Sequence, residues 1–383
     1  MIRIGQSAVV SILLLLLAGA TPLAADSSGR SRDKRVEKSF AVQGRNISLD
    51  STASDITVIA VDGDQASLVV DLEFWSSDEE WMKTVESEFD VEMAESSSEV
   101  SLRLTEMPGS GSKGLLKRIF GGGETYYSVE IALQLPRGTD LSVENRYGDV
   151  LVEQVLGPLK VVNTSGELTI EGVRGGADLE NSYGDATITD VEGGLVLVVS
   201  SGTARVADAT GDVKVSNRYG EVAIADVSGE LDLETSSSEI DVQRIGGRAV
   251  IVGSYADAVV DSVQGPVRLE ISSGNIELSA VEAGAEVAGS YGSIDIEGIG
   301  GELTVRSSSG EVEVRDIGGR TRIENSYGAV VLEDERGSGE VNNPSGGVTV
   351  DGIEGDLSIR SSYEAVRVRE VGGDLTVSTT SSG

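Results

Sequence analysis

Two consecutive stretches decide the fold of this chain: ADLENSYGDATITDVEGG at residues 177–194 and LVLVVSSGTARVADATGD at residues 195–212. They align position by position, so that Tyr183 matches Ser201 and Gly193 matches Gly211. The alternation extends through most of the chain, with tyrosine every 36 residues and serine midway: Tyr147, Tyr183, Tyr219, Tyr255, Tyr291, Tyr327 and Tyr363, then Ser165, Ser201, Ser237, Ser273, Ser309, Ser345 and Ser381. The repeating unit is therefore 18 residues long.

Each unit contains two short stretches in which apolar residues alternate with polar ones, as in Leu168 and Ile170 followed by Ala177 and Leu179. Such alternation predicts β-strands, and the Gly-Gly or Ser-Gly pairs between them predict tight turns in which glycine takes a positive φ. One unit cannot bury its own apolar face, but stacked units can. We therefore predict an all-β fold, a single-chain parallel β-solenoid (β-helix) of about 13 coils, with a cross-section of two or three sides.

The chain before the repeats is less regular. Residues 139–383 form the predicted solenoid, and residues 26–138 form a β region with one short helix at about residues 78–90. The helix is predicted from a capping box that runs from Ser77 to Glu80 and from an apolar stripe of Trp81, Val85 and Phe89. We expect this helix to cover the open N-terminal end of the stack, since terminal coils need protection.

Residues 1–25 have the features of a signal peptide. Arg3 precedes an apolar run from Ala8 to Ala18, and small residues follow at Ala18 and Ala20. The run is short for a membrane span, although a retained anchor is the alternative reading. The sequence therefore predicts an exported protein that is periplasmic, exposed on the cell surface or secreted.

Composition narrows the function. The formal charge of −34 disfavours nucleic acid, because phosphate binding requires clusters of Lys and Arg. The chain has no His and no Cys, which excludes Ser-His and Cys-His nucleophiles. The constant coil length leaves no insertion that could build a cleft. We predict that the protein is not an enzyme and uses no cofactor or metal.

The tyrosines at 147, 183, 219, 255, 291, 327 and 363 are the candidate ligand-binding residues. A ladder of rings along one edge suits stacking against sugars or partner side chains. The alternative is structural, in which each ring seals the corner beside the neighbouring Ser-Gly turn.

An acidic column lies two positions after the alternating tyrosines and serines, at Asp149, Glu167, Asp185, Glu221, Glu239 and Asp257, and is interrupted by Thr203. It is either a solvated stripe that discourages aggregation or a row that binds a hard cation such as calcium.

A basic loop at residues 108–124 is the second candidate contact. Lys113, Leu115, Leu116, Lys117, Arg118, Ile119 and Phe120 form a cationic, apolar island in an acidic chain. It either touches a membrane or a partner, or folds back on its own domain.

The run LQLPRGTDLSVENRYGDVLVE at residues 133–153, with the units that follow, resembles a bacterial putative-adhesin family of unknown function. The resemblance implies an exported or envelope-linked β-solenoid and carries no catalytic residues. We therefore expect a non-catalytic, adhesin-like protein that presents a rigid repetitive surface to a glycan or an envelope protein. The alternative is a structural or envelope-stress component that acts as a spacer or assembles end to end through its C-terminal coils.

Overall fold

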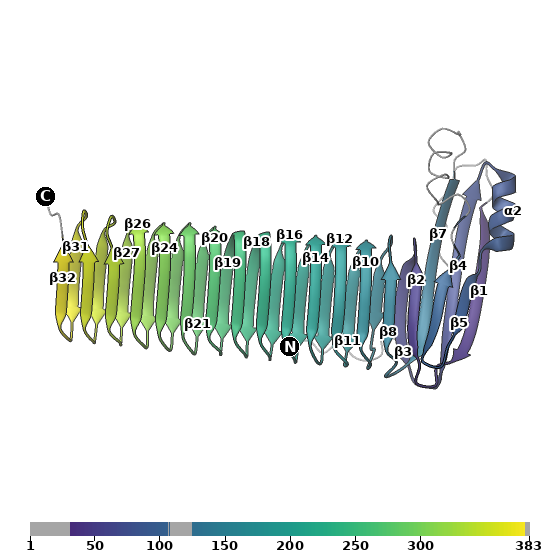
Figure 1. Ribbon diagram of the computed structural model, residues 1–383, viewed down its shortest axis with the longest axis horizontal. Helices are drawn as coiled ribbons and strands as arrows, with labels where there is room; N and C mark the ends of the chain where they lie inside the picture. Colours follow the sequence, from purple (N-terminus) through teal and green to yellow (C-terminus); the bar gives the residue numbers. More distant parts are fainter. Residues whose placement is uncertain (1–30, 106, 108–124, 380–383) are drawn as a thin grey trace, which may run out of the picture.

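The computed structural model describes residues 31–105, 107 and 125–379. Within these residues the protein is almost entirely β-strand, with one short α-helix, and the strands wind into a solenoid of about 13 turns. Figure 1 shows a straight rod with a broader N-terminal region at one end and the C-terminal coils at the other. The β-solenoid predicted from the repeat is confirmed.

Each coil contributes two strands, so the cross-section has two sides. The first sheet consists of β8 (Leu141–Asn145), β10 (Leu159–Ser165), β12 (Ala177–Tyr183), β14 (Leu195–Ser201), β16 (Val213–Tyr219), β20 (Val267–Ser273), β22 (Ala285–Tyr291), β24 (Leu303–Ser309), β26 (Thr321–Tyr327), β28 (Gly339–Asn343), β30 (Leu357–Ser361) and β32 (Leu375–Thr379). The second sheet consists of β9 (Val150–Glu153), β11 (Leu168–Val173), β13 (Ala186–Val191), β15 (Ala204–Ala209), β17 (Val222–Val227), β21 (Ile276–Val281), β23 (Ile294–Ile299), β25 (Val312–Ile317), β27 (Val330–Glu335), β29 (Val348–Ile353) and β31 (Val366–Val371). Two longer strands, β18 (Leu231–Ile245) and β19 (Ala249–Val263), pass through both sheets.

The strands within each sheet are parallel, and their register is 18 residues. Ala177 of β12 pairs with Leu195 of β14, and Tyr183 pairs with Ser201. Alternate side chains such as Leu179 and Ile188 point between the sheets and are fully buried. Columns in the sequence are therefore rows in space, and the apolar columns form one continuous core along the rod.

One residue in each coil of the second sheet has a left-handed backbone. The strand ladder skips this residue, so the residue two before it and the residue after it both point inward, as Ile170 and Val173 do around Gly172. The column has thirteen members, most of which are not glycine: Gln154, Gly172, Asp190, Asp208, Asp226, Arg244, Ser262, Ala280, Gly298, Asp316, Asp334, Gly352 and Glu370. The interruption bends the strand toward the next turn.

Glycine occupies most positions at both edges of the rod, for different reasons. At the edge where the first sheet ends, Gly184 has a φ of +122°, as predicted for a tight turn. At the opposite edge the prediction of positive φ is wrong for most of the column. Gly211 has no positive φ, but a Cβ there would lie 2.2 Å from the carbonyl oxygen of Gly193 in the preceding coil. Close stacking of backbones therefore disfavours a side chain at Gly211, although Ala283 occupies one position of the same column.

The first of these glycine columns is interrupted at Ser238, Ala256 and Glu364. Only the first two of these positions lie within a continuous strand. At these two coils the chain passes through the edge without a break, which is why β18 and β19 are 15 residues long. The edge therefore accepts a continuous strand at these two coils, whereas at Glu364 the chain still turns between β30 and β31.

The N-terminal region continues both sheets. β2 (Asn46–Ser51) pairs in parallel with β8, and β3 (Asp55–Val61) pairs in parallel with β9, so these two strands complete a coil at the start of the stack. Beyond them lie β6 (Glu99–Leu104) with β5 (Val91–Glu95) in one sheet, and β7 (Thr125–Pro136), β4 (Gln65–Ser76) and β1 (Arg32–Ala41) in the other. Several of these outer pairings are antiparallel.

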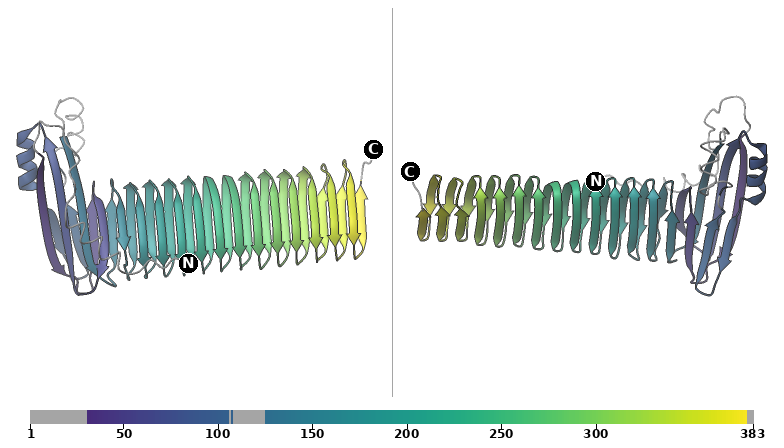
Figure 2. Two further views of the ribbon diagram at one scale, coloured as in Figure 1. Left: turned by 180° about the vertical axis from the view of Figure 1, so that it is seen from behind. Right: turned by 45° about the horizontal axis from the view of Figure 1, so that its top comes forward.

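The helix α2 (Glu79–Glu88) lies at the outer end of this region, against β4 (Figures 1 and 2). Its N-cap is Asp78 rather than the predicted Ser77, because the Asp78 carboxylate accepts the backbone N–H groups of Glu80 and Trp81. Val85 is fully buried, and the ring of Trp81 meets Phe74 edge to face at 6.2 Å between centroids.

Two predicted segments lie outside the described residues: the signal peptide at 1–25 and the basic loop with Lys113, Leu115, Leu116, Lys117, Arg118, Ile119 and Phe120. Within the described part of the chain, no helix has the length and apolar character needed to span a membrane.

Candidate functional site

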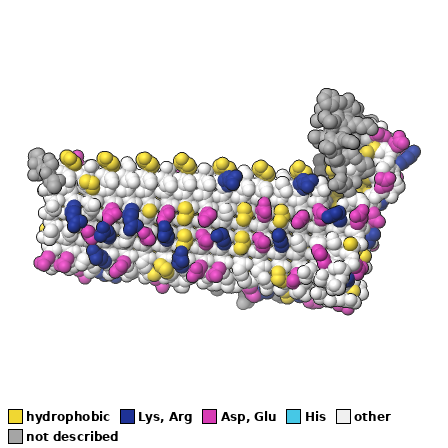
Figure 3. Space-filling model, in the orientation of Figure 1, with side chains coloured by type: hydrophobic (Ala, Val, Ile, Leu, Met, Phe, Trp, Pro, Cys, Tyr) yellow, Lys and Arg dark blue, Asp and Glu magenta, His cyan; other side chains and the backbone are white. Residues whose placement is uncertain are grey.

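The seven repeated tyrosines form a row along one edge of the rod, which we call the tyrosine ridge. The ridge follows the ends of first-sheet strands such as β12 and β16, and it corresponds to the regularly spaced yellow side chains along the upper edge in Figure 3. Each of the seven tyrosine residues has a relative exposure between 55% and 73%. More than half of the surface of each residue therefore faces solvent and is available for contact.

Serines separate the tyrosines. In the strand register, Tyr219 lies beside Ser237 and Ser237 lies beside Tyr255. Each ring from Tyr147 to Tyr327 is followed by a small, half-buried serine. The ridge is consequently a series of aromatic projections with gaps one coil wide. The structure brings the predicted tyrosines into a single column, because their 36-residue spacing equals two coils.

Asparagines hold the turns directly beneath the ridge. Asn181 is fully buried, and its Nδ2 donates to the carbonyl oxygen of Gly184 in its own turn at 2.9 Å and to that of Gly166 in the preceding coil at 3.1 Å. The same arrangement recurs at Asn217 and Asn325. Each of these asparagines therefore links two neighbouring coils through their turn carbonyls. These bonds fix the spacing of the projecting rings.

The acidic column runs beside the ridge, and we call Asp149, Glu167, Asp185, Glu221, Glu239 and Asp257 the acidic border. All six are exposed. The three aspartates also have a structural role, because each carboxylate accepts the backbone N–H of the residue 18 positions later; Asp149, for example, accepts from Glu167 at 2.7 Å. In the described residues, no group of three or more acidic side chains is arranged to hold a metal ion.

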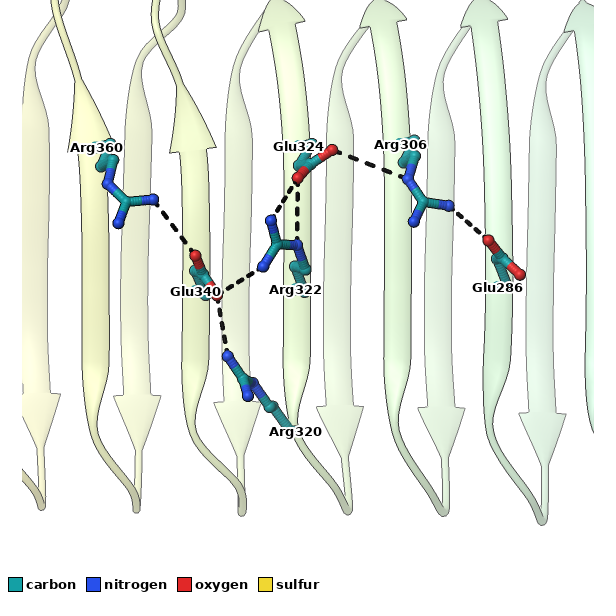
Figure 4. A network of polar contacts seen from close by, with 7 residues as sticks. All are labelled: Glu286, Arg306, Arg320, Arg322, Glu324, Glu340 and Arg360. Carbon is teal, nitrogen blue, oxygen red and sulfur yellow. Dashed lines mark hydrogen bonds and ion pairs between the residues drawn. The ribbon is translucent and has the colours of Figure 1, made fainter.

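A network of ion pairs covers part of the outer face of the first sheet (Figure 4). Glu340, whose side chain is 19% exposed, meets Arg320 and Arg322 at 3.0 Å and Arg360 at 3.4 Å. Arg322 also bonds Glu324, which holds the pKa of that carboxyl below its usual range. The network links neighbouring coils, and such surface pairs contribute at most about 1 kcal/mol each.

A shallow groove runs along the second edge of the rod, over Ala280, Gly298 and Gly300. Ion pairs flank it: Arg244 donates to Asp226 at 2.7 Å, and Arg336 donates to Asp316 at 2.7 Å. The hydrogen bond from Arg244 lowers the pKa of Asp226. A carboxyl with a lowered pKa is a poor general acid.

Sequence reasoning missed one buried polar pair in the core. Glu335 occupies the column held by Ile317 and Ile353 in the adjacent coils, and it is 1% exposed. The hydroxyl of Thr321 donates to one of its carboxyl oxygens, and burial raises the pKa of Glu335 to about 8. A single acid in an apolar column is visible in the sequence, so the repeat alignment could have located it.

The fold and the ridge define the protein as a parallel β-solenoid with a repetitive, solvent-exposed aromatic edge. The family model described as Toastrack DUF4097 matches residues 44–298, from just before β2 to within β23. Because the match spans more than half of the chain, the protein belongs to this family, and the resemblance seen in the sequence is confirmed.

Two solved structures that align with this chain bear names that refer to adhesion. A "putative cell adhesion protein" from Clostridium sporogenes is 10% identical, and the alignment covers 62% of this chain and 100% of that one at a TM-score of 0.22. A "putative adhesin" from Bacteroides fragilis is 16% identical, with coverage of 72% and 97% and a TM-score of 0.21. These TM-scores are too low to support an inference about function. No curated protein matches the chain.

Proposed function

We propose that this protein is an exported, non-catalytic interaction protein of adhesin-like type, which binds a glycan or a protein ligand along the tyrosine ridge. The observation that carries the proposal is the repeated exposure of large aromatic rings, each between 55% and 73% accessible, in one row. Seven tyrosines that served only to seal the edge would bury most of their ring surface. Aromatic side chains with an apolar face and a polar hydroxyl are also enriched in binding surfaces.

The rigidity of the scaffold supports the same proposal. The ridge stands on strands whose register is constant and on asparagines bonded to turn carbonyls. A ligand with a regular repeat would meet several rings at once, with little loss of backbone conformational entropy in the receptor. Weak contacts at single rings would then add to a strong overall interaction.

The chain supplies a matched test, because serine already occupies the ridge position in every second coil. Changing Tyr183, Tyr219, Tyr255 and Tyr291 together to serine converts four tyrosine coils into native-like serine coils. We expect this variant to lose capture of its ligand in a screen of glycans and envelope proteins, with little change in melting temperature. Capture that persists at full strength, together with a lowered melting temperature, would show that the rings are structural.

A second candidate function is that of a stiff spacer in the envelope, which the unbroken register of the two sheets favours. The membrane-contact role of residues 113–120 also remains a proposal. Light scattering on the full chain separates the spacer that assembles end to end from a monomeric binding protein. Deletion of residues 113–120, followed by a vesicle sedimentation assay, tests membrane contact.

A further inference from the structure

The tyrosine ridge has a period that restricts the conformation of a linear ligand. Tyr183 and Tyr219 are separated by one serine coil, and parallel strands lie about 4.8 Å apart, so successive rings are about 9.6 Å apart. A polymer that is to place the same chemical group at each ring must repeat over that distance.

Among polypeptide conformations, one has this repeat. A polyproline II helix rises about 3.1 Å per residue with three residues per turn, and so presents the same face every ~9.3 Å. A β-strand presents the same face every ~6.7 Å, and an α-helix every ~5.4 Å. The mismatch between the ridge and polyproline II is about 0.3 Å per ring, or about 1 Å across four rings.

The chemistry of the ridge also suits this conformation. Prolyl rings pack flat against aromatic faces, and the backbone carbonyls of polyproline II have no internal hydrogen-bond partners. Exposed tyrosine hydroxyls such as that of Tyr183 can donate to those carbonyls. The half-buried serine between two rings leaves room for a side chain of the ligand.

Charge distinguishes the two halves of the ridge. The acidic border accompanies Tyr147, Tyr183, Tyr219 and Tyr255, whereas the corresponding positions beyond it are Asn275, Ser293, Glu311, Ala329, Gly347 and Ala365. Two arginines, Arg146 and Arg218, precede tyrosines in the first half, so acidic groups outnumber basic ones six to two along that segment. A cationic ligand is therefore favoured next to the N-terminal region and not at the C-terminal end.

We infer that Tyr147, Tyr183, Tyr219 and Tyr255, with the acidic border, form a docking surface for a proline-rich polypeptide segment that contains Lys or Arg and adopts polyproline II. This inference rests on the proposed function of the ridge and specifies its ligand. Three ring-to-ring intervals span about 29 Å, which corresponds to about nine residues of the ligand.

Isothermal titration of the full chain at 0.15 M salt with the peptide (Pro-Pro-Lys)4 tests the inference. The control peptide (Gly-Ser-Lys)4 has the same length and charge but is flexible. We expect (Pro-Pro-Lys)4 to bind at least tenfold more tightly than the control. Tyr183→Ser with Tyr219→Ser should weaken binding about tenfold or more, whereas Tyr291→Ser with Tyr327→Ser, in the half without the border, should change it less than twofold.

Charge is tested separately with Glu167→Gln and Glu239→Gln, which leave intact the backbone hydrogen bonds made by the border aspartates. This variant should weaken (Pro-Pro-Lys)4 binding a fewfold and reduce its dependence on salt.

Equal binding of the two peptides, or equal effects of the two tyrosine pairs, overturns the inference. The screen of glycans and envelope proteins separates the two ideas. If the four-tyrosine variant no longer binds a glycan or folded protein from the screen, and the parent protein does not bind (Pro-Pro-Lys)4, the proposed function stands and this inference fails. If no ligand responds to the tyrosine changes, both fail.

Discussion

Replacement of Glu335 should make the rod more stable, because this side chain is an acid within an apolar column. The neighbours above and below are Ile317 and Ile353, and Glu335 is 1% exposed. Burial raises its pKa from 4.5 to about 8; Asp316 adds to the rise, and the hydrogen bond from Thr321 opposes it. The folded protein therefore binds a proton that the unfolded chain has released at neutral pH.

The sign of the effect follows from this difference. Below pH 4.5 the carboxyl is protonated in both states, so it contributes no pH dependence. As the pH rises from about 4.5 to about 8, the folded state holds a proton that the unfolded state lacks, and the free energy of unfolding falls. At pH 7 the loss is at most about 3 kcal/mol, from 2.5 pKa units at about 1.4 kcal/mol each.

Glu335→Gln removes the titration and keeps an acceptor for the Thr321 hydroxyl. We expect its unfolding free energy to exceed that of the parent protein by up to about 3 kcal/mol at pH 7. The difference should shrink toward pH 4.5 and level off above pH 8. Urea denaturation followed by circular dichroism at several pH values measures this, with Glu333→Gln on the outer face of β27 as the control. An identical pH dependence in the parent and the Glu335→Gln variant would refute the reasoning.

Three further predictions concern the backbone and its supports. Gly202→Ala should destabilise the rod by more than about 3 kcal/mol, because the added Cβ would lie 2.2 Å from the carbonyl oxygen of Gly184. The control Gly194→Ala, which has open space around it, should leave stability unchanged. Thermal melts compare the two variants. Ala280→Gly should stabilise the rod by up to about 1 kcal/mol, because Ala280 has a φ of +53°, which glycine adopts more readily than alanine. The control Ala223→Gly, in a regular strand, should destabilise the rod. Asn181→Ala should lower the free energy of unfolding by about 1–3 kcal/mol, because the carbonyls of Gly166 and Gly184 lose their hydrogen-bond donor. Hydrogen exchange at that turn should also increase. Replacement of the exposed Asn342 by Ala serves as the control.

The coil was predictable because side-chain identity marks it. Tyr183 and Ser201 alternate at a fixed spacing, and that spacing is the strand register. The left-handed column was not predictable in the same way, because residues as different as Arg244 and Ala280 share one backbone conformation. All thirteen residues of this column share the left-handed backbone, but they share no residue type that would indicate it in the sequence.

The first coil was not predictable, for a different reason. β2 and β3 join the stack beside β8 and β9, but the intervening strands and α2 separate them in the sequence. A repeat search finds neighbours along the chain and does not detect a coil that is completed across an insertion. At the candidate site, the alignment of the tyrosines was predicted, whereas their degree of exposure depends on the shape of the edge and required the structure.

The alternation of tyrosine and serine constrains how a rod of this kind can change in length. Loss or gain of one 18-residue coil would leave the core intact but would place two tyrosines, or two serines, on adjacent rungs. Removal of the 36 residues from 184 to 219 would shorten the rod and still leave every ring one coil away from a serine. Lengths that differ by even numbers of coils would thus present the same pattern over a shorter or longer reach.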